Sequence, residues 1–132
     1  MIIFIWKPEY SVGIKNIDNQ HKKLIDTINM LHEAVSNKAV LNKIFDNLVE
    51  YTTIHFATEE DLMVRYSYPD YLEHKGEHDK CISKVAKWKT EFDKGKITLT
   101  LEMVTFLIDW IHSHLLEMDQ KYSSFFKKIG LV

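Results

Sequence analysis

Two histidines, His74 and His78, stand four residues apart in a segment whose apolar residues follow helical spacing. Residues four apart lie one above the other on the same face of a helix, so the two imidazoles point the same way. The same face continues through Cys81, Val85 and Trp88. A histidine pair at this spacing is a common way to bind a transition metal. A buried histidine more often forms a hydrogen bond within the core, so the pair alone does not establish a metal site.

Five further side chains that can ligate metals interrupt the apolar faces of three other predicted helices. They are His21, His55, Glu59, His114 and Asp119. In an antiparallel four-helix bundle, the first and third helices begin at the end where the second and fourth helices finish. The sequence positions of all seven side chains fall at that one end. Buried carboxylates are costly without compensating positive charge, which metal cations supply.

Five imidazoles and two carboxylates are too many for one zinc ion, which takes four ligands. We expect two metal ions, bridged by Glu59, Asp119 and an oxo or hydroxo group from solvent. The hypothesis assigns His74, His78 and His114 to one metal, and His21 and His55 to the other. The odd number of histidines leaves one coordination position open for a small molecule. Imidazole-rich ligation with carboxylate bridges favours iron, although affinity alone also admits manganese, cobalt or zinc.

His114 and Asp119 are five residues apart, an unusual spacing for two residues on one helical face. On a regular α-helix, five residues turn about 140° beyond a full circle. The apolar spacing nevertheless resumes after Asp119 with Tyr122 and Phe126. We therefore predict a π-helical turn around residues 114–119, a feature found mostly at functional sites. The alternative is that Asp119 caps a fraying helix end while the preceding methionine lies inside.

An apolar pocket is expected beside the open coordination position. Its predicted lining is Leu24, Phe56, Trp110 and Ile111, each next to a candidate ligand or one turn from it. Core packing explains the same four residues, and the two roles are compatible. No lysine, serine or second acid lies there on the helical stripes to act as a general acid or nucleophile. A dry site without a proton donor suits reversible uptake of O2.

Four amphipathic segments must position these side chains. They are predicted over residues 17–36, 40–66 and 69–92, and from about residue 98 onward. Their similar lengths and short connections predict an all-α fold, an up-down-up-down antiparallel four-helix bundle. We expect one domain over residues 1–132. Its parts are an extended N-terminal arm at 1–15, the bundle at 16–119 and a short C-terminal helical extension at 120–132.

The composition is that of an ordinary globular protein. The 132 residues are 45% hydrophobic and 27% charged, with a net charge of -2. This charge gives no reason to expect nucleic acid or an acidic membrane surface as a partner. Cys81 is the only cysteine, which excludes an internal disulfide and indicates a cytoplasmic protein. We expect it to be a buried apolar residue without a redox role. The apolar N-terminus is interrupted at Lys7 and Pro8, too early for a signal peptide or a membrane span.

Three other polar residues are expected to stay outside the site. His32 lies eleven residues beyond His21, or roughly 16 Å along the helix, at the other end of the bundle. His112 is two positions from a candidate ligand and should face the surface or its boundary. Glu60 follows a candidate bridging carboxylate, points off the apolar stripe and is expected to be solvated.

The sequence resembles the hemerythrin family, specifically its bacterial single-domain members, over nearly its whole length. The segments that carry the resemblance are residues 6–13, 17–24, 55–59, 69–78 and 110–119. The resemblance implies a non-heme di-iron centre that binds O2 reversibly, with the ligand assignment given above. Two departures stand close to the implied O2 pocket. Ile111 occupies a position where the family commonly has leucine, and His112 is unusual between Trp110 and His114.

The leading hypothesis is therefore an O2-binding protein for storage, transport or buffering, and not an enzyme. Its partners would be O2, with NO as an alternative ligand, and an unidentified redox or recipient partner. One alternative is a di-iron redox enzyme that reduces NO or peroxide. The Glu-x-x-His pair of ferritin-like oxidases is absent from the sequence, which argues against that enzyme class. The other alternative is an O2- or NO-sensing module that acts through a separate partner. A histidine phosphotransfer domain would need one exposed histidine rather than five that face inward.

Overall fold

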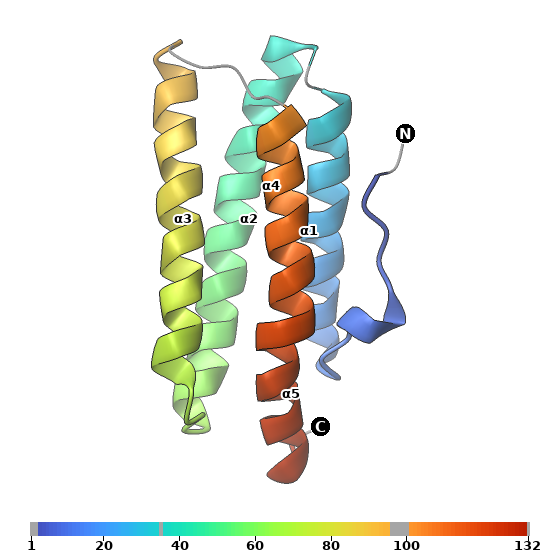
Figure 1. Cartoon of the computed structure of the whole chain (residues 1–132), viewed down its shortest axis with the longest axis vertical. Helices are drawn as coiled ribbons and strands as arrows, with labels where there is room; N and C mark the ends of the chain where they lie inside the picture. Colours follow the sequence, from blue (N-terminus) through green and yellow to red (C-terminus); the bar gives the residue numbers. More distant parts are fainter. Residues whose placement is uncertain (1–2, 35, 96–100, 132) are drawn as a thin grey trace.

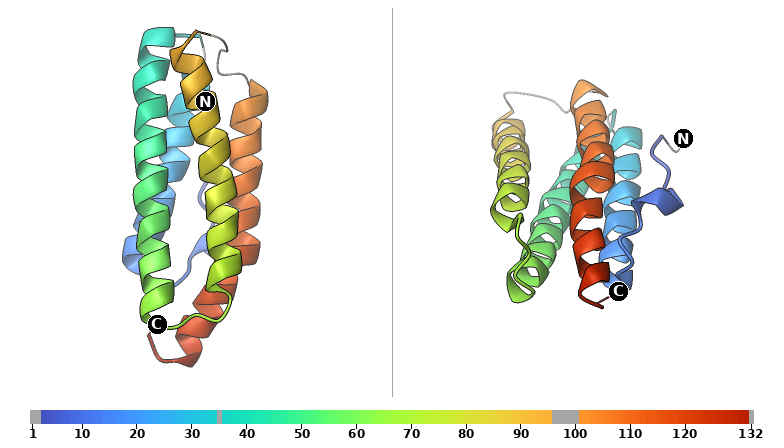
Figure 2. Two further views of the ribbon diagram at one scale, coloured as in Figure 1. Left: turned by 90° about the vertical axis from the view of Figure 1, so that its left-hand side faces the viewer. Right: turned by 60° about the horizontal axis from the view of Figure 1, so that its bottom comes forward.

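Four long helical segments stand side by side in a computed structural model that describes residues 3–34, 36–95 and 101–131. The elements are a short 3-10 turn (Pro8–Tyr10), α1 (Lys15–Glu33), α2 (Lys38–Arg65), α3 (Tyr71–Asp93), α4 (Leu101–Ser113), the π-helical turn η2 (His114–Met118) and α5 (Asp119–Lys128). Helix α1 packs against α2 and α4, and α2 packs against α3. The views in Figures 1 and 2 show an antiparallel arrangement, which confirms the predicted all-α four-helix bundle.

The fourth helical segment of the bundle consists of α4, η2 and α5 in direct succession. Its predicted start near residue 98 lies outside the described residues. The lower end of the bundle in Figure 1 gathers the start of α1, the end of α2, the start of α3 and the junction of α4 with α5. Within the described residues, no helix is both long and apolar enough to cross a membrane.

The connection between α2 and α3 differs from the prediction that the third helix begins at residue 69. Ser67 has a positive φ of 55°, which reverses the chain directly after α2. The N–H of Tyr68 donates to the carbonyl oxygen of Met63 over 2.8 Å and closes the end of α2. Pro69 therefore lies in a tight turn, and α3 begins two residues later at Tyr71.

The N-terminal arm lies along the outside of the bundle (Figure 1). One buried asparagine, Asn29, holds it there. The N–H groups of Ile3 and Phe4 donate to Oδ1 of Asn29 over 3.0 and 2.9 Å. Asn29 Nδ2 donates in return to the carbonyl oxygen of Phe4 over 2.8 Å. Phe4 is buried in the core whereas Ile5 is exposed, so the arm presents alternate residues to the bundle.

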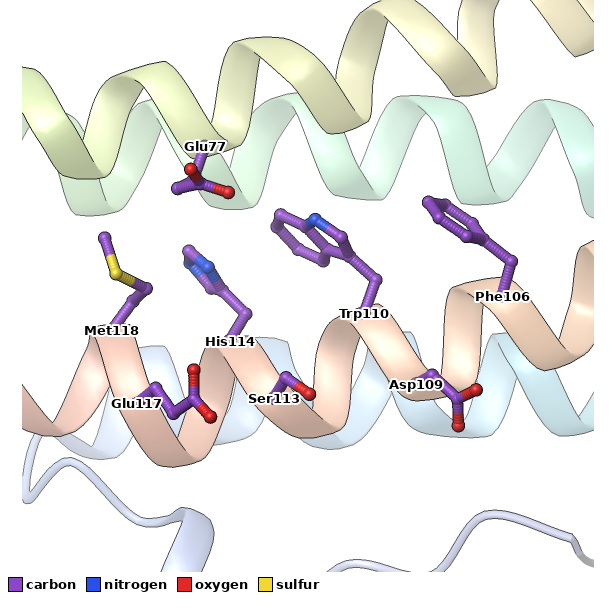
Figure 3. Close-up of a pocket in the computed structure, with 8 residues that line it drawn as sticks. All are labelled: Glu77, Phe106, Asp109, Trp110, Ser113, His114, Glu117 and Met118. Carbon is purple, nitrogen blue, oxygen red and sulfur yellow. The ribbon is translucent and has the colours of Figure 1, made fainter.

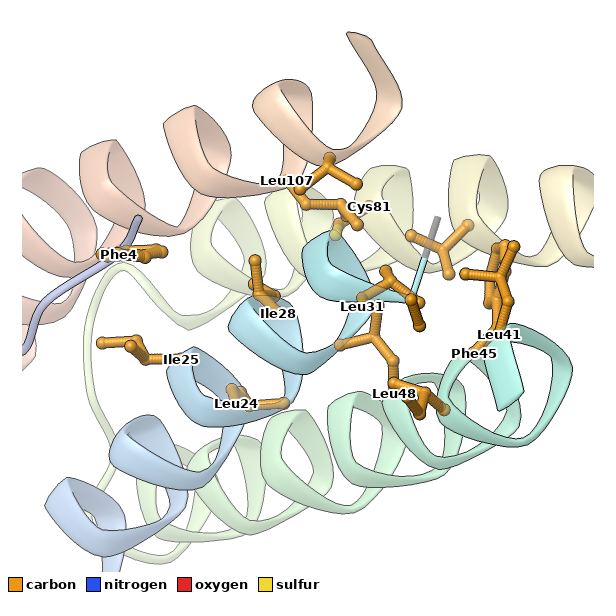
Figure 4. Close-up of a cluster of buried hydrophobic side chains, with 14 of the residues drawn as sticks. Phe4, Leu24, Ile25, Ile28, Leu31, Leu41, Phe45, Leu48, Cys81 and Leu107 are labelled. Atoms are coloured by element: carbon orange, nitrogen blue, oxygen red, sulfur yellow. The ribbon is translucent and has the colours of Figure 1, made fainter. Parts of the chain in front are cut away.

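Two apolar clusters of unequal size fill the bundle, and the polar residues lie between them. The larger cluster includes Leu24, Ile28, Leu31, Phe45, Leu48, Cys81 and Leu107, most of them visible in Figure 4. The smaller cluster comprises Val12, Ile17, Met63, Tyr68, Tyr122 and Phe126. On α1, the small cluster contributes Ile17, the large cluster contributes Leu24, and His21 stands between them. Apolar packing on both sides therefore shields the intervening polar layer from water.

Candidate metal centre

The seven candidate ligands lie together in the polar layer between the two apolar clusters. Each is at most 6% exposed to solvent. Their donor atoms form two groups, and within each group the atoms lie within 4.8 Å of one another. The first group is Glu59, His74, His78, His114 and Asp119, and the second is His21, His55 and Glu59. The division of the histidines into three and two is the one expected from the sequence.

Asp119 contacts histidines of both groups through its two carboxylate oxygens. Its Oδ1 lies 3.1 Å from Nε2 of His74 and 3.0 Å from Nε2 of His114. Its Oδ2 lies 3.2 Å from Nε2 of His21. One carboxylate thus presents one oxygen to each half of the site, which is the arrangement a bridging ligand needs.

Glu59 spans the same two groups from the opposite helix. Its Oε1 lies 2.7 Å from Nε2 of His55, 3.9 Å from Nε2 of His21 and 3.7 Å from Nε2 of His78. The first two histidines belong to one group and the third to the other. The two carboxylates therefore link both sets of imidazoles.

Hydrogen bonding within the chain leaves this site unsatisfied. Both carboxylate oxygens of Glu59 and of Asp119, and Nε2 of His21 and His74, are buried without a properly oriented hydrogen-bond partner among the described residues. Nε2 of His78 faces Nε2 of His114 across 3.0 Å. Native proteins rarely leave buried polar atoms unpaired, because each one costs free energy. A donor set of inward imidazole nitrogens and orphaned carboxylates fits metal cations.

The electrostatics of the site indicate the same need for positive charge. Burial raises the pKa of Glu59, as does the nearby Asp119, but the histidines outweigh both and hold it well below its usual value. Burial lowers the pKa of His21, but the two carboxylates outweigh burial and raise it to about 9. Burial lowers the pKa of His78 to about 3, which keeps its ring neutral. Without a metal, protons on the imidazoles neutralise the carboxylates, and metal binding would displace those protons.

The predicted π-helical turn is confirmed at His114–Met118. The N–H of Asp119 donates to the carbonyl oxygen of His114, a bond that spans five residues instead of four. The extra residue is absorbed within one turn, so His114 and Asp119 both face the site despite their spacing. The alternative of a fraying end is wrong, because α5 continues to Lys128.

The expectation for Glu60 is wrong. Its Oε2 lies 2.9 Å from Nδ1 of His78, and its side chain is only 18% exposed. A glutamate side chain is long enough to reach around α2 to α3, although its Cα is off the apolar stripe. Gln20 was not among the predicted site residues, but its Oε1 lies 2.7 Å from Nδ1 of His55. Partners of this kind could have been expected, because metal-binding histidines usually donate their outer N–H to a carboxylate, a carbonyl or water.

A small cavity lies against the centre. It is lined by His21, Leu24, His55, Phe56, Trp110, Ile111, His114, Leu115 and Asp119. The four residues expected to line an apolar pocket are all among them. The centre of a water-sized molecule can occupy a volume of about 10 Å³ in this cavity. This volume is near the minimum needed to hold one small molecule. The cavity thus has room for one small molecule and no larger ligand.

Aromatic rings fix two of the histidines on the side facing this cavity. Phe56 stacks on His78 with ring centroids 3.8 Å apart and planes within 3°. Trp110 stacks on His114 with centroids 4.4 Å apart and planes within 13°. Tyr122 closes the opposite side, and its burial together with Glu59 raises the pKa of its hydroxyl well above the usual value. The ring of Tyr122 therefore stays neutral.

An outer cleft of about 480 Å³ opens on the surface between α3 and the fourth helical segment, which is formed by α4, η2 and α5. It is lined by Glu77, Phe106, Asp109, Trp110, Ser113, His114, Glu117 and Met118 (Figure 3). Trp110 and His114 line both this cleft and the inner cavity. The stacked pair therefore forms part of the wall between the outer cleft and the inner cavity.

The remaining histidines and the cysteine lie outside the cluster, as expected. His32 is half-buried near the far end of α1. His112 is half-buried, and its Nδ1 lies 2.7 Å from the hydroxyl of Tyr10 in the arm. Cys81 is 4% exposed, and burial raises the pKa of its thiol to about 12. None of these three groups contributes a donor atom to the cluster.

Fold and site together define a four-helix-bundle protein with a candidate dinuclear metal centre between its helices. A sequence profile described as "Hemerythrin HHE cation binding domain" matches residues 12–126. The chain belongs to the hemerythrin family.

Similar proteins agree with this assignment over almost the whole chain. A bacteriohemerythrin of Clostridium acetobutylicum is 36% identical, covering 91% of this chain and 98% of the relative. A hemerythrin-like protein of Naegleria gruberi is 30% identical over 90% of each chain. A crystal structure of wild-type hemerythrin is 30% identical and superposes with a TM-score of 0.90, covering 92% of this chain and 96% of that one.

Proposed function

We propose that this chain binds O2 reversibly at a non-heme di-iron centre, for storage, transport or buffering, and that it is not an enzyme. The observation that carries the proposal is the pair of carboxylates, Glu59 and Asp119, each in contact with histidines of both groups beside a small apolar cavity. When bound, the two iron ions supply the electrons that make O2 uptake reversible.

The proposal assigns the protein ligands as follows. The metal with no open position takes His74, His78 and His114. The metal with the open position takes His21 and His55. Glu59 and Asp119 would each serve both metals, and solvent would supply the oxo or hydroxo group. The division of the histidines and the shared Glu59 follow the two groups of donor atoms. The role of Asp119 follows from its contacts with His21 and His114.

The pocket residues would hold O2 and keep water away from it. Leu24 and Phe56 are 3% exposed, so they present dry hydrocarbon to the cavity. Trp110 and Ile111 complete the proposed O2 pocket. Among the described residues, those that line the cavity include no lysine, serine or tyrosine that would deliver a proton to bound O2. Without such a donor, O2 is released unchanged rather than converted to product.

An O2 titration of the iron-loaded protein tests this function. The chain is reconstituted with ferrous iron without air, exposed to O2, and then placed under vacuum while visible absorption is recorded. We expect an absorption change that reverses under vacuum over repeated cycles. Steady consumption of O2 in the presence of a reductant would instead assign the chain to the redox enzymes.

The same proposal includes a cellular setting. A carrier needs a recipient for O2 and a redox partner that reduces iron after accidental oxidation. The single free cysteine, Cys81, is consistent with the reducing environment of the cytoplasm. Pull-down of a reductase from cell extract, followed by its reduction of the oxidised protein, would identify the redox partner.

A further inference from the structure

Two of the five imidazoles are held from outside the site by side chains of different charge. Nδ1 of His78 on α3 lies 2.9 Å from a carboxylate oxygen of Glu60 on α2. Nδ1 of His55 on α2 lies 2.7 Å from the amide oxygen of Gln20 on α1. By contrast, Nδ1 of His21 and of His74 is buried without a hydrogen-bond partner among the described residues. The two supported histidines belong to different groups of donor atoms.

The hydrogen bonds around Gln20 determine which nitrogen of His55 carries the proton. The hydroxyl of Thr58 donates to the carbonyl oxygen of Ile54 over 2.9 Å. The same hydroxyl oxygen accepts from Nε2 of Gln20 over 3.4 Å, which turns Oε1 of Gln20 toward His55. An amide oxygen only accepts, so Nδ1 of His55 must donate. When a metal replaces the proton on Nε2, the lone pair of that nitrogen faces the site.

Glu60 determines the tautomer of His78 more directly. An ionised carboxylate has no proton to donate, so Nδ1 of His78 donates and its Nε2 lone pair faces inward. The imidazole is fully buried, and Phe56 stacks on its face, so the ring has no freedom to turn away. A hydrogen bond to a charged acceptor is stronger than one to a neutral amide. It also makes the imidazole a stronger electron donor toward a metal.

We propose that Glu60 and Gln20 are positioning residues that make the two metal positions unequal. Glu60 raises the cation affinity of the metal position of His78 through its full negative charge. Gln20 supports the metal position of His55 through a neutral dipole only. This inference rests on the proposed dinuclear centre. It adds that the metal position of His78 binds a cation more tightly than its number of histidine ligands would explain. The extra affinity is attributed to Glu60.

Zinc affinity provides a test that needs neither iron nor O2. The full chain is titrated with Zn²⁺ in competition with a chromophoric chelator, to give a dissociation constant for each of two binding steps. Glu60→Gln keeps the size and the acceptor but removes the charge, and we expect it to weaken one step about tenfold. Glu60→Ala removes both and should weaken that step by up to about 100-fold. The other step should stay at its wild-type value.

Asp61→Asn is the matched control. Asp61 is the next residue on α2, its side chain is 66% exposed, and it pairs with Arg65 rather than with the site. The substitution removes the same charge without touching a histidine, so both zinc affinities should be unchanged. The reciprocal variant Gln20→Glu should tighten the step that Glu60→Gln leaves alone.

Nitrogen NMR of the histidine rings separates positioning from general stability. In the zinc-loaded wild type, His55 and His78 should each carry their proton on Nδ1. Glu60→Gln should keep this tautomer, whereas Glu60→Ala should speed exchange of the His78 proton with water. If both Glu60 variants matched Asp61→Asn in affinity and spectra, the proposed role of Glu60 would be refuted and the metal centre would stand. If the wild type failed to bind two zinc ions, the metal centre itself would be refuted.

Discussion

The backbone N–H of Asp119 donates to the carbonyl oxygen of His114, and Oδ1 of the same aspartate lies 3.0 Å from Nε2 of that histidine. The π-helical turn therefore acts as a one-residue insertion that keeps both side chains on one face. Each residue of a regular α-helix advances the face by about 100°, so the number of residues between the two ligands decides whether both reach the site.

Shortening this turn by one residue and lengthening it by one residue should therefore have different effects on metal binding. Deleting Leu116, which is 38% exposed, leaves His114 and Asp119 four apart on a regular α-helix and still on one face. We expect this variant to retain two metals per chain. Inserting an alanine after Leu116 should rotate Asp119 off the face and lower the metal content. Circular dichroism establishes that both variants are helical, and elemental analysis counts the metals. Loss of metal from a helical deletion variant would contradict this account.

The position of a histidine in the bundle should decide its effect on metal content. His78→Ala removes a fully buried candidate ligand, and we expect metal affinity to fall by more than about 100-fold, since loss of an outer partner alone costs 10- to 100-fold. His32→Ala alters a half-buried histidine near the far end of α1 and should leave both metals bound. Metal content after dialysis measures the difference. Equal losses in the two variants would show that the ligands do not form one layer.

The thiol of Cys81 should be inert in the folded protein. Burial raises its pKa to about 12, so at pH 8 its reactive thiolate is depleted by about three orders of magnitude relative to an unperturbed thiol. A thiol reagent should therefore react slowly under native conditions and rapidly in denaturant. Because the thiolate is favoured only on unfolding, raising the pH toward 12 should destabilise the fold. Rapid labelling of the native chain would show that Cys81 is accessible.

Removing the wall between the outer cleft and the inner cavity should speed ligand entry. Trp110 lines both spaces and stacks on His114, so Trp110→Ala should join them. We expect azide to bind the oxidised iron-loaded protein faster, as followed by stopped-flow absorption. The loss of a half-buried ring should also cost about 2 kcal/mol of unfolding free energy.

Trp88→Ala is the control for that loss of stability. Trp88 is also a partly buried tryptophan, and it packs against Phe106 and the large apolar cluster, away from the cavity. It should lower stability by a similar amount without changing the rate of azide binding. A similar acceleration in both variants would mean that general loosening of the bundle, and not the Trp110 wall, limits ligand entry.

Helical periodicity alone was sufficient to predict the fold and the layer of candidate ligands. The repeat of apolar residues reports which face of each helix is buried, and polar interruptions such as His21 and Glu59 stand out against it. The five-residue step from His114 to Asp119 conflicts with that repeat, so it also revealed the π-helical turn. Each of these features depends on neighbours within one helix, and local geometry is readable from the order of the residues.

Features that depend on how one helix faces another could not be predicted from the sequence. Glu60 lies off the apolar stripe of α2, and only the packing of α3 beside it places the carboxylate 2.9 Å from His78. Gln20 reaches His55 from α1 for the same reason. The start of α3 also depended on the positive φ of Ser67, which no periodicity reports. Periodicity gives the angular position of a residue on its own helix, but the distance between two helices and the reach of a side chain across it are set by packing.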